Sequence, residues 1–207
     1  MSGLASASEL APAIIRFWFE EVGKNRWFAR DKVLDAEIKR RFGKTRDVVL
    51  ASRAQGWRDT PEHILAAILL LDQCSRNINR GSARAFEGDA LALELATLAL
   101  DRGWTRSASK DWQQFLLMPL QHSENLSDQE RSLAEFEQLG DEFVLGFARM
   151  HFDQVRRFGR FPGRNRALGR VSSPDELEVI GRGEIFQQSS RRQTFVDNPK
   201  PYIDLDV

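Results

Sequence analysis

The sequence predicts an all-α protein whose helices pack as antiparallel pairs. Apolar residues recur at three- and four-residue spacing along almost the whole chain of 207 residues. No window shows the sustained alternation of apolar and polar residues that strands need. Signals that start helices also recur, so we expect a single helical domain over residues 1–182 and an irregular C-terminal tail over residues 183–207.

Residues that cap a first turn predict where helices begin. The pattern of a capping box, a serine followed three residues later by a glutamate, occurs at Ser6/Glu9, Ser127/Glu130 and Ser173/Glu176. Proline fits the first helical position after Thr60 and again after Ser173. We therefore expect helices to start near residues 9, 61, 128 and 174.

Apolar spacing between these starts predicts further helices over residues 31–55, 61–79, 83–101, 111–117 and 142–158. The fourth of these is expected to end around Pro119. Alanines at helical spacing within residues 86–103 let neighbouring helices approach closely, which favours a tetratricopeptide-like or α-solenoid-like arrangement. No second copy is clear at a period of about 34 residues, so an irregular orthogonal bundle is the alternative.

The tail over residues 183–207 has little periodicity but contains several apolar residues, among them Ile185, Phe186, Phe195, Tyr202 and Leu205. That composition is too apolar for a free linker. Three arrangements are open: the tail lies extended across the helices, packs on a partner chain, or forms a partly ordered terminus.

Composition limits the classes of function. Lys+Arg and Asp+Glu are equal at 30 each, and this balance argues against nucleic-acid and membrane-surface binding. The single cysteine, Cys74, excludes an internal disulfide. The chain has neither an apolar run of about 18 residues nor the N-terminal pattern of a signal peptide, so we expect a cytoplasmic protein. A homodimer is compatible with these features.

The densest local feature is an arginine-rich stretch over residues 151–170. Its only acid is Asp153, and its six arginines are Arg156, Arg157, Arg160, Arg164, Arg166 and Arg170. Arginine carries a permanent charge and a rigid fork of donors that suits carboxylate and phosphate. Glycine and proline bend the chain here, and we expect Arg160, Arg164 and Asn165 to project from the bend. The stretch therefore predicts a site for an anion.

A second segment, residues 69–86, is more polar than a helical core requires. Asp72, Arg76 and Arg80 are spaced by four and share one helix face, and Gln73 and Asn77 lie beside them. These side chains either contribute to a site or form a solvated ladder of salt bridges.

A third segment, residues 118–130, holds His122, Ser123 and Glu124 in a short link after Pro119, where site residues are often held. His122 is a candidate general acid or base with Glu124 as its partner. The alternative is that His122 caps a helix end and Glu124 forms a salt bridge. His151 lies on a buried or half-buried helix face, where a histidine is more often a core residue than a ligand.

No metal and no cofactor are expected. His122, Glu124, His151 and Asp72 are ligand types, but no pair of them has the tight spacing of HExxH. The chain also lacks G-x-S-x-G and the phosphate-binding loops GxGxxG and GxxxxGK(S/T), which excludes the standard nucleotide-binding folds.

Five long blocks carry a resemblance to a known family. They are FWFEE (17–21), RWFARD (26–31), LLLDQCSRNINRGSARAFEGDALAL (69–93), FLLMPLQHSENLSDQE (115–130) and HFDQVRRFGRFPGRNRALGRVSSPDE (151–176). In order and spacing they resemble the uncharacterised bacterial and fungal family catalogued as domain of unknown function 924, over roughly residues 10–182. The resemblance implies an all-helical, tetratricopeptide-like fold and supplies no established reaction.

The resemblance also implies that polar residues from three separated segments belong to the family's signature. They are Asp72, Gln73, Arg76, Asn77, Arg80, His122, Ser123, Glu124, His151, Arg160, Arg164 and Asn165. Such a set is easiest to explain if its members meet in one pocket. One position departs from the family pattern, which usually reads FGRFPHRN, because Gly163 replaces the histidine.

Three hypotheses follow. The first is a module that binds a small anionic ligand or a peptide carboxylate, with Arg76, Arg80, Arg160 and Arg164 as contacts and Asn77 and Asn165 fixing its orientation. The second is a hydrolase or lyase for an anionic substrate, in which His122 or His151 is the acid/base, Glu124 its partner, and the arginines stabilise negative charge. The third is a peptide-binding scaffold in which the polar set is purely structural.

Overall fold

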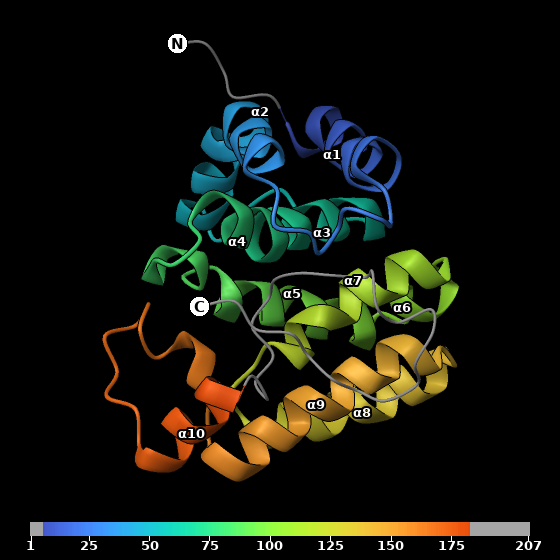
Figure 1. Cartoon of the computed structure of the whole chain (residues 1–207). Helices are drawn as coiled ribbons and strands as arrows, with labels where there is room; N and C mark the ends of the chain where they lie inside the picture. Colours follow the sequence, from blue (N-terminus) through green and yellow to red (C-terminus); the bar gives the residue numbers. More distant parts are fainter. Residues whose placement is uncertain (1–5, 183–207) are drawn as a thin grey trace.

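The structure is a computed structural model that describes residues 6–182, and within this range every regular element is a helix. The expectation of an all-α fold is thereby confirmed. The C-terminal tail predicted over residues 183–207 lies outside the described residues. The layers follow one another in chain order from the N-terminal helices to α9, with α10 beside the end of α9 (Figure 1).

The N-terminal half forms two layers. Its elements are α1 (Ala7–Arg16), the π-helix η1 (Phe17–Val22), α2 (Lys32–Ala51), α3 (Pro61–Ile68), the π-helix η2 (Leu69–Cys74) and α4 (Ser75–Ile78). Helix α1 packs on α3, and α2 packs on η2 and α4. The continuous run of α3, η2 and α4 corresponds to the helix predicted over residues 61–79, with a π-helical turn in its middle.

The C-terminal half continues the stack. Its elements are the 3-10 helix η3 (Ala83–Ala85), α5 (Asp89–Asp101), α6 (Trp104–Ser107), α7 (Lys110–Gln121), α8 (Leu126–Leu139), α9 (Glu142–Phe158), the 3-10 helix η4 (Pro162–Arg164) and α10 (Pro174–Arg182). Helices α5 and α7 pack on α3, and α8 lies between α7 and α9 in the order of contacts. The bounds of α9 match the predicted helix over residues 142–158.

Two apolar cores lie in this stack, and α7 contributes to both. The larger core joins α1 to α7 and includes a group of edge-on aromatic rings in which Phe115 of α7 contacts Trp18 and Trp27. The smaller core joins α7, α8 and α9 and includes Leu117, Leu120 and residues of the two later helices. Burial of this apolar surface is the main driving force for the fold.

Local capping explains most helix starts. The Ser6 N–H group donates to Glu9 Oε2 at 2.7 Å, and the Ser173 N–H group donates to Glu176 Oε2 at 2.7 Å, so both of these predicted starts are confirmed. The start predicted at Ser127 is wrong by two residues. Asn125 precedes α8, and its Oδ1 accepts from the Ser127 N–H group at 2.9 Å. Asparagine caps as well as serine does, and it comes first in the chain.

The predicted end of α7 is also wrong, since this helix runs through Pro119 to Gln121. Met118 and Leu120 on either side of the proline are buried. This packing offsets the loss of one helical hydrogen bond. The consequence for the site is direct, because the two further residues of helix carry His122 to the interior of the molecule, where its side chain is 5% exposed.

One close backbone approach also positions the site. A Cβ atom on Gly88 would lie 2.5 Å from the carbonyl oxygen of Leu71, so only glycine fits where the start of α5 meets η2. An aspartate follows each of the two residues in this contact: Asp89 follows Gly88 at the start of α5, and Asp72 follows Leu71 in η2. The contact brings both carboxylates to the same part of the interior.

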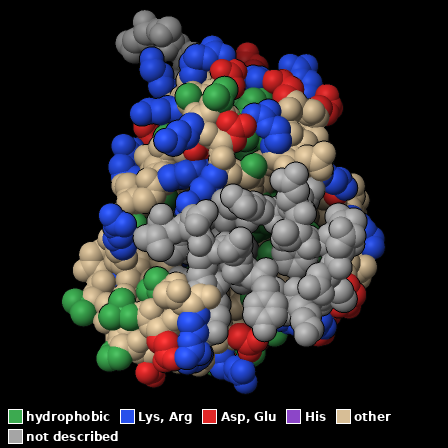
Figure 2. All heavy atoms as spheres, viewed as in Figure 1, with side chains coloured by type: hydrophobic (Ala, Val, Ile, Leu, Met, Phe, Trp, Pro, Cys, Tyr) green, Lys and Arg blue, Asp and Glu red, His purple; other side chains and the backbone are tan. Residues whose placement is uncertain are grey.

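The surface of this stack has mixed charge. In the view of Figure 2, acidic side chains lie among the basic ones over the N-terminal helices, in keeping with a formal net charge of zero. None of the helices between residues 6 and 182 has the length and apolarity required to cross a membrane.

Candidate functional site

A pocket of about 510 Å³ opens where the start of α2, the end of α4, the end of α7, α9 and the η4 segment meet. Its described lining consists of Arg30, Asp31, Lys32, Asp35, Arg76, Arg80, Gly81, Ala85, Phe86, His122, His151, Phe161, Gly163, Arg164 and Ala167. Pockets of this size suit small-molecule ligands. Five of the residues singled out from the sequence therefore meet here: Arg76, Arg80, His122, His151 and Arg164.

Asp72 lies directly behind this lining, in the π-helical turn η2. All six residues of η2 are buried, because α2, α3 and α5 pack around this turn. Single π turns inside α-helices are frequent at functional sites. The Asp72 side chain is 0% exposed, so the alternative of a solvated salt-bridge ladder along this helix is wrong for Asp72.

Three donors hold the Asp72 carboxylate. His122 Nδ1 lies 2.7 Å from Oδ1, Arg76 NH1 lies 2.8 Å from Oδ1, and Gln73 Nε2 donates to Oδ2. Burial by itself would raise the pKa of Asp72, but the Arg76 and His122 groups and the Gln73 hydrogen bond more than offset it, so the pKa lies below its ordinary value. Asp72 is therefore an anion at neutral pH.

The ionised carboxylate fixes the state of His122. Burial lowers the pKa of His122 below its ordinary value, although Asp72 opposes this change. The imidazole is therefore neutral at neutral pH, with its proton on Nδ1 facing Asp72 and a lone pair on Nε2. Within residues 6–182 no group forms a hydrogen bond to this Nε2 atom.

A second neutral imidazole lies beside it. The ring centroids of His122 and His151 are 5.8 Å apart, and His151 Nδ1 donates to the carbonyl oxygen of Phe147 at 2.8 Å. The pKa of His151 is lowered to about 3, mainly by burial and to a smaller extent by the nearby charges, among them Arg164 and Arg76, although the hydrogen bond to Phe147 opposes this change. His151 thus contributes to the pocket as an uncharged ring.

The two buried arginines share one carboxylate, that of Asp89. Arg76 donates to both of its oxygens at 2.8 and 2.9 Å, and Arg164 NH1 donates to Oδ2 at 3.2 Å. Arg164 NH2 also donates to the carbonyl oxygen of His122 at 2.9 Å. Burial lowers the pKa of Arg164 to about 10, and the side chain remains charged at neutral pH.

Aromatic rings hold the Arg164 guanidinium as well. Its central carbon lies 4.8 Å from the ring centroid of Phe86 and 4.5 Å from that of Phe161. Contacts of this kind restrict the side chain and add cation–π attraction. The group is held in place before any ligand enters.

The outer part of the pocket is more exposed. Arg80 pairs with Asp35 at 2.6 Å, and Asn77 donates to the same carboxylate at 2.8 Å. Lys32 is exposed and has no ion-pair or hydrogen-bond partner among the described residues. Around the pocket, the cationic side chains are Arg30, Lys32, Arg76, Arg80 and Arg164, whereas Asp31 and Asp35 are its only described carboxylates.

Several predicted residues do not line the pocket. Arg160 forms a two-pronged ion pair with Glu176 at 2.7 and 2.8 Å, and Asn165 donates to the same carboxylate at 3.2 Å. Ser123 donates to Asp128 at 2.6 Å. These side chains hold the link between α9 and α10 and the start of α8.

The predicted pairing of His122 with Glu124 is replaced by another one. Glu124 accepts from both terminal nitrogens of Arg170, at 2.9 and 2.8 Å, and from the Phe161 N–H group at 2.9 Å. Burial raises its pKa, but Arg170 and the Phe161 N–H group lower it more, so the pKa is below its ordinary value. The partner of His122 is Asp72, 50 residues earlier in the chain.

Sequence reasoning missed Asp89, Phe86 and Phe161. Asp89 is the first residue of α5 and has the appearance of an ordinary acidic residue in a first turn. The two phenylalanines have the appearance of core residues. Their importance is seen only in the structure, where Asp89 pairs with Arg76 and Arg164 and the two rings contact the Arg164 guanidinium group.

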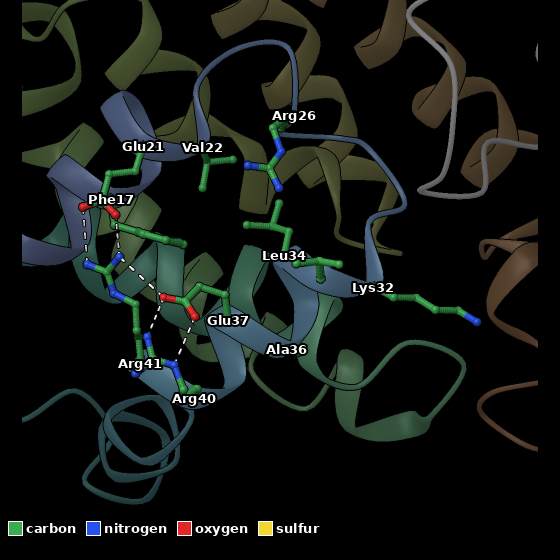
Figure 3. Close-up of a pocket in the computed structure, with 11 residues that line it drawn as sticks. Phe17, Glu21, Val22, Arg26, Lys32, Leu34, Ala36, Glu37, Arg40 and Arg41 are labelled. Atoms are coloured by element: carbon green, nitrogen blue, oxygen red, sulfur yellow. Dashed lines mark hydrogen bonds and ion pairs between the residues drawn. The ribbon is translucent and has the colours of Figure 1, made fainter.

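A second cavity of about 680 Å³ lies between η1 and α2 (Figure 3). Its floor includes Phe17, Val22 and Leu34, and its rim is closed by ion pairs of Arg41 with Glu21 and of Arg40 with Glu37. Lys32 lines both cavities, and its side chain extends away from the other residues of Figure 3. The larger cavity therefore offers little unpaired charge, and the smaller one is the candidate site.

No group of three or more His, Cys, Asp or Glu side chains within the described range is placed to hold a metal ion. The two imidazoles instead face guanidinium groups, which repel a cation.

Comparison with known proteins agrees with this architecture. A protein of unknown function from Agrobacterium tumefaciens, ATU0120, has a solved structure that is similar to the present one with a TM-score of 0.81. The two sequences are 35% identical, and the match covers 86% of this chain and 100% of that one. No curated protein is significantly similar to the chain. Residues 14–184 match a family described as bacterial proteins of unknown function, DUF924, and the chain belongs to that family.

Proposed function

We propose that the pocket binds a small anionic ligand or the carboxylate of a peptide. The observation that carries this proposal is the charge of the lining, in which five cationic side chains face two carboxylates. A concave site with walls of low dielectric strengthens the field of such a set and attracts anions. The cytoplasmic location predicted from the sequence remains a prediction, as do the homodimer and the lack of nucleic-acid and membrane partners.

Arg164 supports the proposal because its donors are only partly used. A guanidinium group has five N–H donors, and within the described residues Arg164 gives one from NH1 to Asp89 and one from NH2 to His122. Its remaining donors can bind an anion without breaking a contact of the fold. One charge-assisted hydrogen bond contributes about 1.5–3 kcal/mol, so two or three of them support roughly micromolar affinity.

The test is calorimetry with phosphate, succinate, citrate and short peptides that end in a free carboxylate. Arg164→Lys keeps the charge but removes the planar fork, and we expect it to weaken binding by about tenfold or more. Lys32→Gln should weaken binding by a few-fold. Lys39→Gln is its matched control, because Lys39 is an exposed lysine of the same helix outside the pocket lining.

The third hypothesis, a purely structural polar set, is favoured by one observation. Each of Arg80, Arg160 and Arg170 has a carboxylate partner within the chain. The same calorimetry separates the two functions. If no anion of the panel produces heat and none raises the melting temperature, the polar set is structural and the binding proposal is wrong.

A further inference from the structure

The Nε2 atom of His122 is the part of the Asp72–His122 pair that no residue between 6 and 182 binds. Nδ1 is bound to Asp72 at 2.7 Å, whereas Nε2 has no hydrogen-bond partner among the described residues, and His122 lines the pocket. A neutral imidazole nitrogen with a lone pair at a pocket wall is a hydrogen-bond acceptor for whatever molecule enters the pocket. A site that accepts a proton from a bound molecule would explain its presence.

The surroundings of His122 hold the ring in one orientation. Asp72 is fixed by Arg76 and Gln73 in addition to His122, so its carboxylate cannot follow a rotating imidazole. His151 lies on one side at a centroid distance of 5.8 Å, and Arg164 binds the carbonyl oxygen of His122 itself. A carboxylate that orients the imidazole in this way is a recurring feature of histidine bases.

The lining leaves water as the nucleophile that such a base could activate. The described lining residues include no serine, threonine, cysteine or tyrosine. Cys74 lies two residues after Asp72, but burial raises the pKa of its thiol to about 12 and it does not line the pocket. A hydroxyl or thiol nucleophile is therefore not available from these residues.

We infer that the protein is a hydrolase, in which His122 Nε2 is the general base that activates water against an ester or amide bond of an anionic substrate. This inference rests on the proposed function, because the pocket must first bind the anion. The exposed end of the lining, with Lys32 and Arg80, takes the carboxylate of the substrate. The buried end, with His122 and Arg164, takes the scissile bond.

The reaction balances without a cofactor. His122 Nε2 accepts a proton from water while the water oxygen bonds to the carbonyl carbon, and the electron pair of the C=O bond moves onto its oxygen. The unused N–H groups of Arg164 stabilise that negative charge. As the intermediate collapses, the bond to the leaving oxygen or nitrogen breaks and Nε2–H returns its proton to that atom. The products are a carboxylic acid and an alcohol or amine.

The experiment uses the full chain and two chromogenic esters. Mono-4-nitrophenyl succinate carries a free carboxylate, and 4-nitrophenyl butyrate is its neutral counterpart of similar length. We expect hydrolysis of the succinate ester at a kcat/KM at least tenfold above that of the butyrate. His122→Gln should lower the succinate rate by about 10²–10⁴-fold. His63→Gln, which removes a histidine of α3 outside the pocket lining, should leave the rate unchanged.

Asp72 acts through His122 and is a positioning residue, so its test is a pH profile. Asp72 raises the pKa of His122, and Asp72→Asn should therefore move the acidic limb of the kcat/KM profile, where the base becomes protonated, to lower pH as well as lower the rate. A variant that was merely less stable would lose rate without moving the limb. Circular dichroism of each variant confirms that it is folded.

Two outcomes would overturn the inference separately from the binding proposal. If succinate binds by calorimetry but the wild-type protein cleaves neither ester faster than His122→Gln, the pocket binds anions and is not this hydrolase. If the wild-type protein cleaves both esters at equal rates and His122→Gln retains those rates, the activity arises elsewhere on the surface. If succinate and the other anions of the panel do not bind, the proposed function itself has failed.

Discussion

The neutral, buried His151 predicts a loss of stability in mild acid. Its pKa is about 3 in the folded protein, whereas a histidine in an unfolded chain titrates near 6.5. Below about pH 6.5 the unfolded state therefore binds a proton that the folded state excludes. The stability that depends on His151 is fully present above this pH and is lost as the pH falls from about 6.5 towards 3.

The magnitude follows from the same pair of values. A histidine that stays neutral in the folded state costs about 1.4 kcal/mol for each pH unit below its unfolded pKa. Between pH 6 and pH 5 the unfolded histidine is only partly protonated at the start, so the expected loss for His151 is about 1 kcal/mol. His122 has a lowered pKa as well and adds a loss of the same sign.

The assay is urea unfolding at pH 7.5, 6.0 and 5.0, with the free energy of unfolding extrapolated to water. His151→Gln keeps a donor for the carbonyl oxygen of Phe147 but removes the titrating ring. Its free energy of unfolding should fall by about 1 kcal/mol less than that of wild type between pH 6 and pH 5. Leu145→Ala is the matched control, because it removes a buried side chain of the same helix and keeps both histidines.

The decisive quantity is the change in the free energy of unfolding between pH 6 and pH 5, and the comparison does not depend on the absolute stability of each protein. If wild type and His151→Gln lose the same free energy between pH 6 and pH 5, the buried imidazole binds a proton in the folded state and the reasoning fails. If Leu145→Ala shows a reduced slope, the slope reports general destabilisation. Proton uptake by unfolded aspartate and glutamate near pH 5 is common to the three proteins and cancels when their slopes are compared.

Three further substitutions test the contacts behind the pocket by chemical or thermal denaturation. Asp89→Asn leaves the charges of two buried arginines without their shared carboxylate and should cost about 3–5 kcal/mol; an effect below about 1 kcal/mol would mean that the arginines find other partners. Gly88→Ala places a Cβ atom 2.5 Å from a backbone oxygen and should cost roughly 1–3 kcal/mol or more, whereas Gly146→Ala, where a Cβ meets nothing within 4 Å, should be neutral or stabilising. Arg46→Met removes the buried donor that binds Ser75 and Glu87 and should cost about 3 kcal/mol; a cost below about 1 kcal/mol would contradict a stabilising role for these contacts.

Much of the fold could be predicted from local signals. Ser173 and Glu176 form a cap because the two residues are three apart, and this information lies entirely within the sequence. The end of α7 could not be predicted in the same way, whereas the start of α8 depends on a local signal, Asn125, that precedes the serine chosen as the cap. In α7 the burial of Met118 and Leu120 decides whether a helix passes through proline, and burial depends on helices that are distant in sequence.

The same distinction between local and long-range contacts applies to the candidate site. The pairing of Asp72 with Arg76 follows from a spacing of four on one helix and is found at 2.8 Å. The pairing of Asp72 with His122 spans 50 residues and arises because the end of α7 meets η2 in space. Sequence reasoning chose Glu124 for this role because it lies two residues from His122, but neighbours in a bend can point to different partners.

The position of α7 in both apolar cores has a consequence for how the protein unfolds. Phe115 belongs to the larger core, and Leu117 and Leu120 belong to the smaller one, so neither core can unfold without disturbing the same helix. The protein is therefore expected to melt in a single cooperative transition rather than in two steps. A molecule that binds beside His122, at the end of this helix, would then slow amide hydrogen exchange in α1 as much as in α9.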